Sequence, residues 1–514
     1  MSLNSLPNEI LHEIACLTGG DVKFLRLVDK LVNGAVDPVM WDIHPIILDL
    51  DRGHLALGMS MLDKLSNSSD EKIRKLEIKS LNPAKERPHH PAPDKPDNTE
   101  AVAEACRRLP DILPRALSAL KGLKSVRWEL ARKEPEWIHD AVLESLGPLP
   151  TLVDFEITIV NHIGGGREPD AVLPLQPLQH LRNGSLQRLA IKHKSIPDLK
   201  RFVSSVATVL LHNPHIVHLE LDIKPAYGQR WEQLSFQDLV QDLPSNTIRL
   251  RSLLLSGWTI QVTPRTWPHL ASLHSLELLS SAEYGALWKS LCSSPPKSIR
   301  HVTAGRVCDE LLDFLQSVSG LEVLELSSAG GDTLAESDRL ARRFYQDVFP
   351  RHRSTLRKVT ISPSYTGMWT IGLHNVDIFD KCRRLTHLTV GLDPDEIRPG
   401  ENEQDVVASF IARVVHLPEL SVLFLPPVAP KEFFGALRGG GTRRFHATKY
   451  IIERTQESLQ NVVIYDAPRV HQSLSISATW VIGTRGEDFL PLYNDEGSLR
   501  FQRPEVEPEP DDED

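Results

Sequence analysis

Cysteine is scarce in this sequence of 514 residues, and its positions are scattered. The five cysteines are Cys16, Cys106, Cys292, Cys308 and Cys382. An odd number without paired spacing fits a reducing compartment better than a disulfide framework. The N-terminus also lacks a basic region followed by an apolar run, and no stretch approaches the length of a membrane span. We therefore expect a cytoplasmic or nuclear protein, or one found in both compartments, with no membrane partner.

Basic residues are outnumbered, since 58 lysines and arginines stand against 68 aspartates and glutamates and give a net charge of −10. A chain that binds nucleic acid needs a basic field, so this balance argues against nucleic acid as the main partner. The last ten residues, 505–514, hold seven of the acids and no base. This acidic end predicts a disordered tail whose simplest role is solubility.

Motifs of catalysis and of cofactor binding are missing as well. The sequence has no Gly-x-Ser-x-Gly turn, no glycine-rich phosphate loop and no cysteine pair with zinc-finger spacing. His12 and Glu13 look like the start of a zinc-protease motif, but the position one turn on is Cys16 rather than histidine. We expect a non-catalytic protein with no cofactor and no bound metal.

The first forty or so residues carry apolar side chains at helical spacing. Pro7 suits a first helical turn, and Ile10, Leu11 and Ile14 then form one apolar stripe. A second helix and a short third segment follow, and the segment ends near Trp41. Three short helices cannot bury these side chains among themselves, so we expect the segment to dock on another protein.

This N-terminal segment resembles the F-box motif, in Leu6-Pro7, Glu9-Ile10-Leu11, Ile14, Leu17, Leu25-Leu27-Val28, Lys30 and Trp41. It departs from the family at Asp29 and Val32, where a small polar residue or cysteine and an aromatic residue are usual, so the second helix matches less well. The resemblance implies binding to a Skp-type adaptor, which links such proteins to a cullin and a RING ubiquitin ligase. The implied adaptor contacts are Leu6, Pro7, Ile10, Leu11, Ile14, Leu25, Val28 and Trp41.

From residue 73 onward a short pattern returns, with apolar residues at the first, fourth and sixth positions. Its thirteen predicted units are Ile73-Leu76-Ile78, Leu123-Val126-Trp128, Leu152-Phe155-Ile157, Leu186-Leu189-Ile191, Ile216-Leu219-Leu221, Leu250-Leu253-Leu255, Leu273-Leu276-Leu278, Ile299-Val302-Ala304, Leu321-Leu324-Leu326, Leu356-Val359-Ile361, Leu385-Leu388-Val390, Leu420-Leu423-Leu425 and Leu459-Val462-Ile464. Amphipathic helices are predicted between strands, for example over 199–210 and 406–414. A short strand with a returning helix buries its apolar side only by stacking on its neighbours.

The pattern resembles the leucine-rich repeat family, although the Asn or Cys ladder of regular repeats is missing. The predicted fold class is α/β: an N-terminal three-helix F-box followed by an irregular leucine-rich-repeat-like solenoid with a parallel concave sheet. An ordinary α/β domain with parallel strands is the alternative. Such a domain would need a glycine-rich phosphate turn or another ligand site where the strand order reverses, and the sequence shows neither. The predicted domains are F-box helices at 1–50, a linker and first repeat at 51–81, a disordered proline-rich insertion at 82–100, the solenoid at 101–485, and a tail at 486–514.

The predicted concave face carries a column of central residues, one from each strand unit. In chain order these are Glu77, Arg127, Glu156, Ala190, Glu220, Leu254, Glu277, Thr303, Glu325, Thr360, Thr389, Phe424 and Val463. Alternate glutamates would lie about 10 Å apart, close to the Debye length, so their repulsion is tolerable. We expect a charged N-terminal part and a more apolar C-terminal part with Phe424 as an exposed anchor. The candidate substrate contacts are Glu220, Glu277, Glu325, Val422, Phe424 and Val463. The glutamates are equally well read as solvated strand residues without a ligand.

The F-box resemblance and the repeats together predict a substrate-recognition subunit of a Skp-cullin-F-box ubiquitin ligase. It would bind the adaptor through its N-terminal helices and an unknown protein substrate through its solenoid. One alternative is a leucine-rich-repeat scaffold outside any ligase, with the N-terminal helices as a solenoid cap. Another is an enzyme on an irregular α/β scaffold, which would show a deep pocket with convergent polar groups.

Overall fold

The structure, a computed structural model, describes most of the chain after residue 43. The described residues are 44–67, 71–84, 99–130, 134–159, 177–193, 198–223, 234–244, 248–279, 284–401, 405–433, 441–465, 470–471, 473–479, 488–493 and 498–503. They belong to two compact units, residues 1–258 with 263–270 (unit 1) and residues 259–262 with 271–514 (unit 2). The predicted F-box contacts Leu6, Pro7, Ile10, Leu11, Ile14, Leu25, Val28 and Trp41 lie outside the described residues. The predicted domain bounds stay a prediction.

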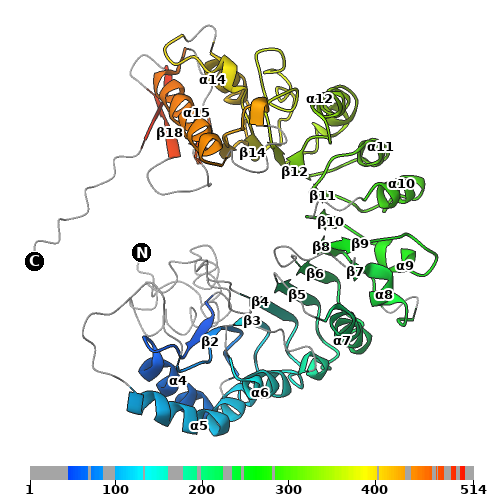
Figure 1. The fold of residues 1–514 in the computed structure, drawn as a ribbon, viewed down its shortest axis with the longest axis vertical. Coiled ribbons are helices and arrows are strands. Elements are labelled where there is room, and N and C mark those ends of the chain that lie inside the picture. The colour runs from blue at the N-terminus through cyan, green and yellow to red at the C-terminus, as the bar shows by residue number, and fades with distance from the viewer. Residues whose placement is uncertain are drawn as a thin grey trace, which may run out of the picture. The chain divides into compact units, whose positions relative to one another are not determined.

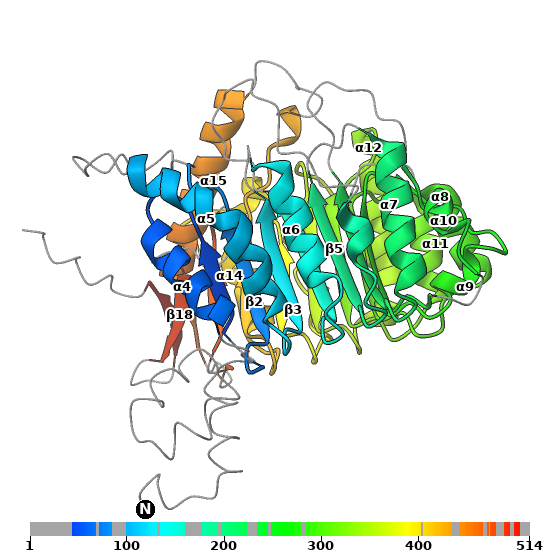
Figure 2. The same ribbon diagram turned by 90° about the horizontal axis from the view of Figure 1, so that it is seen from below.

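Unit 1 alternates strands and helices. Most of its strands form one parallel sheet in the order β1-β2-β3-β4-β5-β6-β8, and β7 pairs with β9 in a separate two-stranded sheet. Figures 1 and 2 both place α4, α5, α6 and α7 along one side of this sheet. In chain order the elements are β1 (Ile46–Asp49), α4 (Leu55–Asn67), β2 (Lys75–Ser80), α5 (Thr99–Ser118), β3 (Ser125–Leu130), α6 (Glu136–Leu146), β4 (Asp154–Ile159), the 3-10 helix η3 (Pro177–His180), β5 (Arg188–His193), α7 (Leu199–His212), β6 (His218–Ile223), β7 (Leu234–Ser235), α8 (Phe236–Val240), β8 (Ser252–Ser256), β9 (Trp258–Thr259) and α9 (Trp267–Leu270).

The strand register of unit 1 follows the predicted repeats. The middle apolar residue of each predicted unit pairs with that of the next, as in Leu76 with Val126 and Phe155 with Leu189. These side chains point toward the helices and are at most 1% exposed. Each repeat therefore buries its apolar side against the helices and the neighbouring repeats, as the sequence pattern predicts.

The strands of unit 1 follow an arc with the helices on its outer side (Figure 1). Strands pair about 4.8 Å apart, whereas packed helices need about 8–10 Å between their axes. A repeat with a helix on one side only must therefore bend away from that side. The helices α4, α5, α6 and α7 all lie on the outer side, and we call the opposite face of the sheet the inner face.

Unit 2 repeats the same arrangement and then changes it. Figure 1 shows α10, α11 and α12 on one side of its sheet. The elements are β10 (Ser275–Leu278), α10 (Gly285–Ser293), β11 (His301–Ala304), α11 (Asp309–Ser317), β12 (Val323–Ala329), α12 (Leu334–Arg343), the π-helical turn η4 (Phe344–Val348), α13 (Phe349–His352), β13 (Lys358–Pro363), β14 (His387–Val390), the 3-10 helix η5 (Pro394–Glu396), α14 (Val406–Val414), β15 (Val422–Phe424), the 3-10 helix η6 (Lys431–Phe433), α15 (Gly441–Asn461), β16 (Val463–Ile464), β17 (Ser475–Ser477), β18 (Asp488–Tyr493) and β19 (Leu499–Gln502).

The parallel part of unit 2 runs in the order β10-β11-β12-β13-β14-β15-β17, with the predicted middle residues in register from Leu276 to Leu423. The thirteenth predicted unit is wrong. Leu459 belongs to α15, and the two-residue strand β16 that follows it pairs antiparallel with β19. The place beside β15 is taken by β17, whose Ile476 pairs with Leu423. The chain is thus a mixed α/β protein whose strands are mostly parallel.

The two helices predicted between strands are confirmed. Asp198 caps α7 by accepting a hydrogen bond from the amide of Arg201, and Asp405 caps α14 through the amide of Val407. Both helices bury an apolar stripe at three- and four-residue spacing. The caps and stripes explain why these sequences are helical despite their many β-branched residues.

Side chains in the turns replace the missing ladder of regular repeats. The buried Asn213 amide donates to the carbonyl of Leu181 at 2.7 Å, which joins neighbouring turns of unit 1. In unit 2 the Thr355 hydroxyl donates to the carbonyl of Leu321 at 2.6 Å. Different polar residues therefore satisfy the turn carbonyls at different repeats, which accounts for the irregular sequence pattern.

Four cysteines lie among the described residues, and none forms a disulfide there. Cys106 is exposed, whereas Cys382 is buried. Burial raises the pKa of the Cys308 thiol to about 11 and that of Cys382 to about 12. In the part of the chain that the structure describes, no helix is both long and apolar enough to cross a bilayer.

Candidate functional site

The inner face of unit 1 carries the predicted central column. Strand pairing aligns Glu77, Arg127, Glu156, Ala190 and Glu220 in one row across β2 to β6. The row is continuous because the side-chain period of a strand is two residues and the register does not slip between these strands. Sequence reasoning therefore placed these residues on a common face correctly.

Arg188 is the centre of an ion-pair network on this face. Its guanidinium donates to Asp154 at 2.9 Å and to Glu156 at 3.0 Å, both on β4. It also donates to Glu220 on β6 at 3.0 Å. One side chain of β5 thus binds three carboxylates from its two neighbouring strands. The fork of donors on a guanidinium suits this arrangement better than an ammonium would.

Lys192 joins the same network from the other end of β5. Its ammonium lies 3.1 Å from a carboxylate oxygen of Glu156 and 3.1 Å from one of Glu220. Ala190 lies between these two glutamates in the row and is completely buried. A small side chain here leaves the space in which Arg188 and Lys192, two residues away on either side, reach both glutamates.

The cations that Glu156 and Glu220 share therefore offset the repulsion between these two carboxylates. Their separation is not the reason that this repulsion is small. The side chains of Glu156 and Glu220 are 12% and 19% exposed, and those of Arg188 and Lys192 are 32% and 33% exposed. Partly buried pairs are screened by salt less than surface pairs. We call Asp154, Glu156, Arg188, Lys192 and Glu220 the β4–β6 network.

The network fixes the charge of its members. Burial alone would raise the pKa of the Glu156 carboxyl, but hydrogen bonds and charge from Lys192 and Arg188 hold that pKa below its usual value. Burial lowers the pKa values of Arg188 and Lys192, and their carboxylate partners more than offset this, so both pKa values are raised. At the edge, burial and the nearby positive Arg188 lower the pKa of His218, which is therefore mainly neutral at pH 7.

Unit 2 carries a row of its own with the same alternation. Glu277, Thr303 and Glu325 align across β10, β11 and β12. Glu325 pairs with Lys358 of β13 at 2.6 Å, and Glu277 accepts a hydrogen bond from Ser275 at 3.3 Å. The structure thus brings the candidate contacts Glu277 and Glu325 onto one face, while Glu220 belongs to the sheet of unit 1.

The apolar end of the predicted face differs from the expectation. Phe424 aligns with Thr389 in the row as predicted, but its expected exposure is wrong, because only 8% of it is accessible. An aromatic ring between two paired strands gains by covering neighbouring side chains instead of standing in water. Val422 is half-buried on the same strand, whereas Val463 lies on β16 and is outside the row.

One group of three residues in the described chain could be considered for a metal. Ligand atoms of Asp49, Asp51 and His54 lie within 4.8 Å of one another. Asp51 accepts hydrogen bonds from the amides of Gly53 and His54 at 3.1 Å each, and it lies 3.0 Å from the His54 ring nitrogen. These contacts close the turn that leads into α4, so the group has a structural role and we assign no metal to it.

The chemistry that the inner face offers is ion pairing and hydrogen bonding with a polar partner. Arg127, at 55% exposure and 3.9 Å from Glu156, extends the β4–β6 network toward solvent. With Arg127 included, three carboxylates face three cations, so a partner meets a pattern of alternating charge. Sequence reasoning missed Lys192 as a site residue, although its spacing of four residues from Arg188 in a strand places both on one face.

Comparison with known proteins finds remote structural likenesses. No protein-family model matches the sequence, and no curated protein matches it. The fold is similar to a chain in the crystal structure of the Rad7 and Elc1 complex in yeast, with 14% identity, a TM-score of 0.38, and coverage of 81% of this chain and 87% of that chain. A Bacteroides fragilis protein matches with 11% identity, a TM-score of 0.23, and coverage of 54% of this chain and 60% of that chain.

Proposed function

We propose that this protein is the substrate-recognition subunit of a Skp-cullin-F-box type ubiquitin ligase. Its N-terminal segment binds a Skp-type adaptor, and its parallel sheets bind a protein substrate. The observation that carries the substrate half is the β4–β6 network on the inner face of unit 1. The adaptor half rests on the F-box resemblance of the N-terminal sequence.

The β4–β6 network suits a protein partner because it is both wide and fixed. Its charges come from three neighbouring strands, so a complementary surface must present several groups at once. Strand pairing holds the backbone in place, and shared ion pairs restrict the side chains, which lowers the entropy lost on binding. Complementary charges then give specificity and fast association more than raw affinity.

The contribution of such a subunit to ubiquitination is proximity. Binding adaptor and substrate at the same time raises the effective concentration of substrate lysines near the charged ubiquitin carrier. This role needs no catalytic residue in the chain. It needs two surfaces that work independently, and the two halves of the proposal supply them.

Two variants test adaptor binding and substrate binding separately. Replacing Ile10 and Leu11 by alanine removes two apolar contacts, each worth about 1.5–3 kcal/mol when buried. The adaptor affinity should fall at least about a hundredfold. Arg127→Glu places a negative charge beside Glu156 on an exposed position of the inner face, and it should weaken substrate binding while leaving adaptor binding intact.

The test is affinity capture from cells in which ligase activity is blocked, followed by mass spectrometry. The wild type should capture a Skp-type adaptor, a cullin and a set of substrate proteins. The Ile10/Leu11 variant should lose only the adaptor and cullin, and Arg127→Glu should lose only substrates. Arg107→Glu, at a 72% exposed position on α5, is the matched control. Capture of the substrate set without adaptor or cullin by the wild type would favour a scaffold outside any ligase.

A further inference from the structure

Helix α7 carries more apolar surface than the core of unit 1 uses. Its core-facing residues are the buried Phe202, Ser205, Val206, Val209 and Leu210. A second stripe, Leu199, Val203, Ala207 and Leu211, repeats every fourth residue and so occupies another face of the helix. Leu211 at its end is 47% exposed. This stripe extends about 18 Å along the helix.

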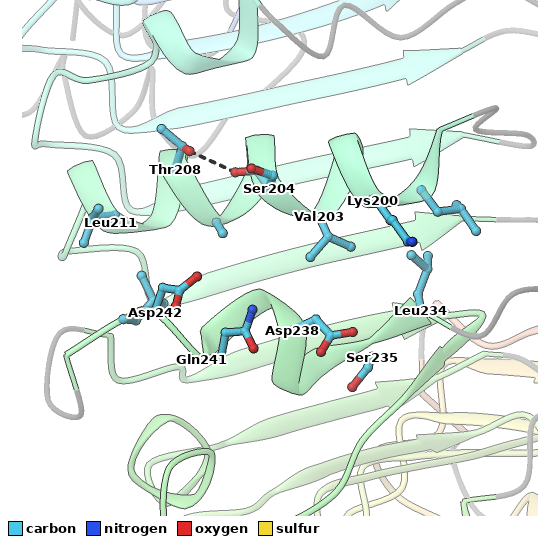
Figure 3. A pocket seen from close by; sticks show the side chains of 13 residues that line it. Lys200, Val203, Ser204, Thr208, Leu211, Leu234, Ser235, Asp238, Gln241 and Asp242 are labelled. Carbon is cyan, nitrogen blue, oxygen red and sulfur yellow. Dashed lines mark hydrogen bonds between the residues drawn. The ribbon is translucent and has the colours of Figure 1, made fainter.

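The second stripe lines a groove on the helical side of unit 1. The groove has a volume of about 530 Å³, and its other wall is formed by α8 and the residues that flank it. Figure 3 shows the side chains of α7 and α8 facing each other across it. α7 has 14 residues but α8 has only 5, so the helical layer is under-filled at this repeat. The groove follows α7 from Leu199 to Leu211, and this length suits an elongated segment better than a compact ligand.

The wall opposite the stripe is acidic. Asp238 and Asp242, four residues apart at the start and just beyond the end of α8, are both exposed. Lys200, near the start of α7, is the one basic residue among the described residues that line the groove. The groove therefore has an apolar wall on α7 and a negatively charged wall on α8.

We propose that this groove binds a basic amphipathic helix of a partner protein. The apolar stripe of that helix covers Val203, Ala207 and Leu211, and its lysines or arginines pair with Asp238 and Asp242. The bound helix completes the layer that the short α8 leaves open. This mode of recognition, a helix laid along a groove, uses apolar anchors at three- and four-residue spacing. The proposal does not depend on the function of the inner face.

The probe is a synthetic 15-residue helical peptide with leucine at every fourth position and three lysines on one flank. A matched peptide carries glutamate in place of the lysines. Binding to the full-length protein is measured by fluorescence anisotropy at physiological salt. We expect the basic peptide to bind at least tenfold more tightly than the acidic one. Hydrogen exchange with the bound peptide should show protection of residues 199–212.

Four variants locate the site. Leu211→Glu and Asp238→Lys should each weaken binding of the basic peptide at least tenfold, without a change in thermal unfolding, because both positions are exposed. Leu57→Glu, on α4 at 66% exposure, and Asp140→Lys, exposed on α6, make the same chemical changes away from the groove. They should change affinity by no more than twofold.

Three results would overturn the proposal. In the first, Asp140→Lys weakens binding as much as Asp238→Lys, which would mean a general attraction to an acidic protein. In the second, Leu211→Glu binds the basic peptide as the wild type does. In the third, sedimentation shows a dimer that Leu211→Glu dissociates, which would make the groove a contact between two copies of this chain.

Discussion

Replacing Arg188 by methionine tests whether the β4–β6 network holds unit 1 together. The substitution keeps most of the apolar stem and removes only the guanidinium. It leaves Asp154, Glu156 and Glu220 without the cation that binds all three. Lys192 still contacts Glu156 and Glu220, so part of the charge remains compensated.

The expected loss follows from burial. Exposed ion pairs contribute about 0.2–1 kcal/mol, and hydrogen bonds to charged groups in protected sites about 1.5–3 kcal/mol. Arg188 is one-third exposed, so each of its three contacts falls near the boundary between these ranges. Allowing for the remaining Lys192, we expect a loss of about 2 kcal/mol in the local stability of β5. That corresponds to an increase of about thirtyfold in the equilibrium for opening this strand.

Native-state hydrogen exchange with mass spectrometry measures that opening region by region. Peptides that cover β4, β5 and β6 should exchange about thirtyfold faster in Arg188→Met, while peptides of unit 2 should be unchanged. Arg107→Met is the control, since the Arg107 side chain is 72% exposed and pairs with Glu104 of the same helix. It should change exchange by no more than about twofold. Equal effects of the two substitutions would refute the idea that the network is a structural unit.

Three further predictions follow from single residues. Because the pKa of Glu156 in the folded protein lies below its ordinary value of 4.5, ionised Glu156 stabilises the fold above that pH. This contribution is lost as pH falls through the lowered pKa, so Glu156→Gln should reduce the drop in melting temperature between pH 5 and about pH 3; an unchanged drop contradicts the assignment. At pH 8 a thiol reagent should label Cys106 rapidly and Cys382 only after unfolding, because burial raises the pKa of Cys382 to about 12; peptide mapping reads the sites, and rapid labelling of Cys382 would show that it is accessible. Phe424→Ala should destabilise unit 2 by about 3 kcal/mol, as expected for a buried phenylalanine; urea unfolding measures this, and a neutral effect would restore Phe424 as an exposed anchor.

The repeat register was readable from the sequence because each strand buries its middle apolar residue. Leu76 through Leu253, and Leu276 through Leu423, pair as the pattern predicts. The pattern failed at residue 459, because α15 runs to Asn461 and includes the first apolar position of the expected unit. Periodicity alone does not tell a short strand from a helical turn that carries apolar residues.

The site was only partly readable. The row of Glu156, Ala190 and Glu220 came from the side-chain period of strands, but the network depends on which cations reach across two strands. Arg188 and Lys192 reach both strands because of the strand register and the small size of Ala190. The pattern of a single sequence does not reveal how these two factors combine. The groove beside α7 depends on how short the next helix is, and repeat patterns carry little information on that length.

Binding of the full-length protein to a purified Skp-type adaptor is the most direct test of the proposed function. Biolayer interferometry should show a stable complex with the wild type and a loss of affinity of at least about a hundredfold for the Ile10/Leu11→Ala double variant. Arg127→Glu should bind the adaptor as the wild type does. An adaptor that does not bind the wild type, or that binds the double variant equally well, would contradict the assignment to a ubiquitin ligase.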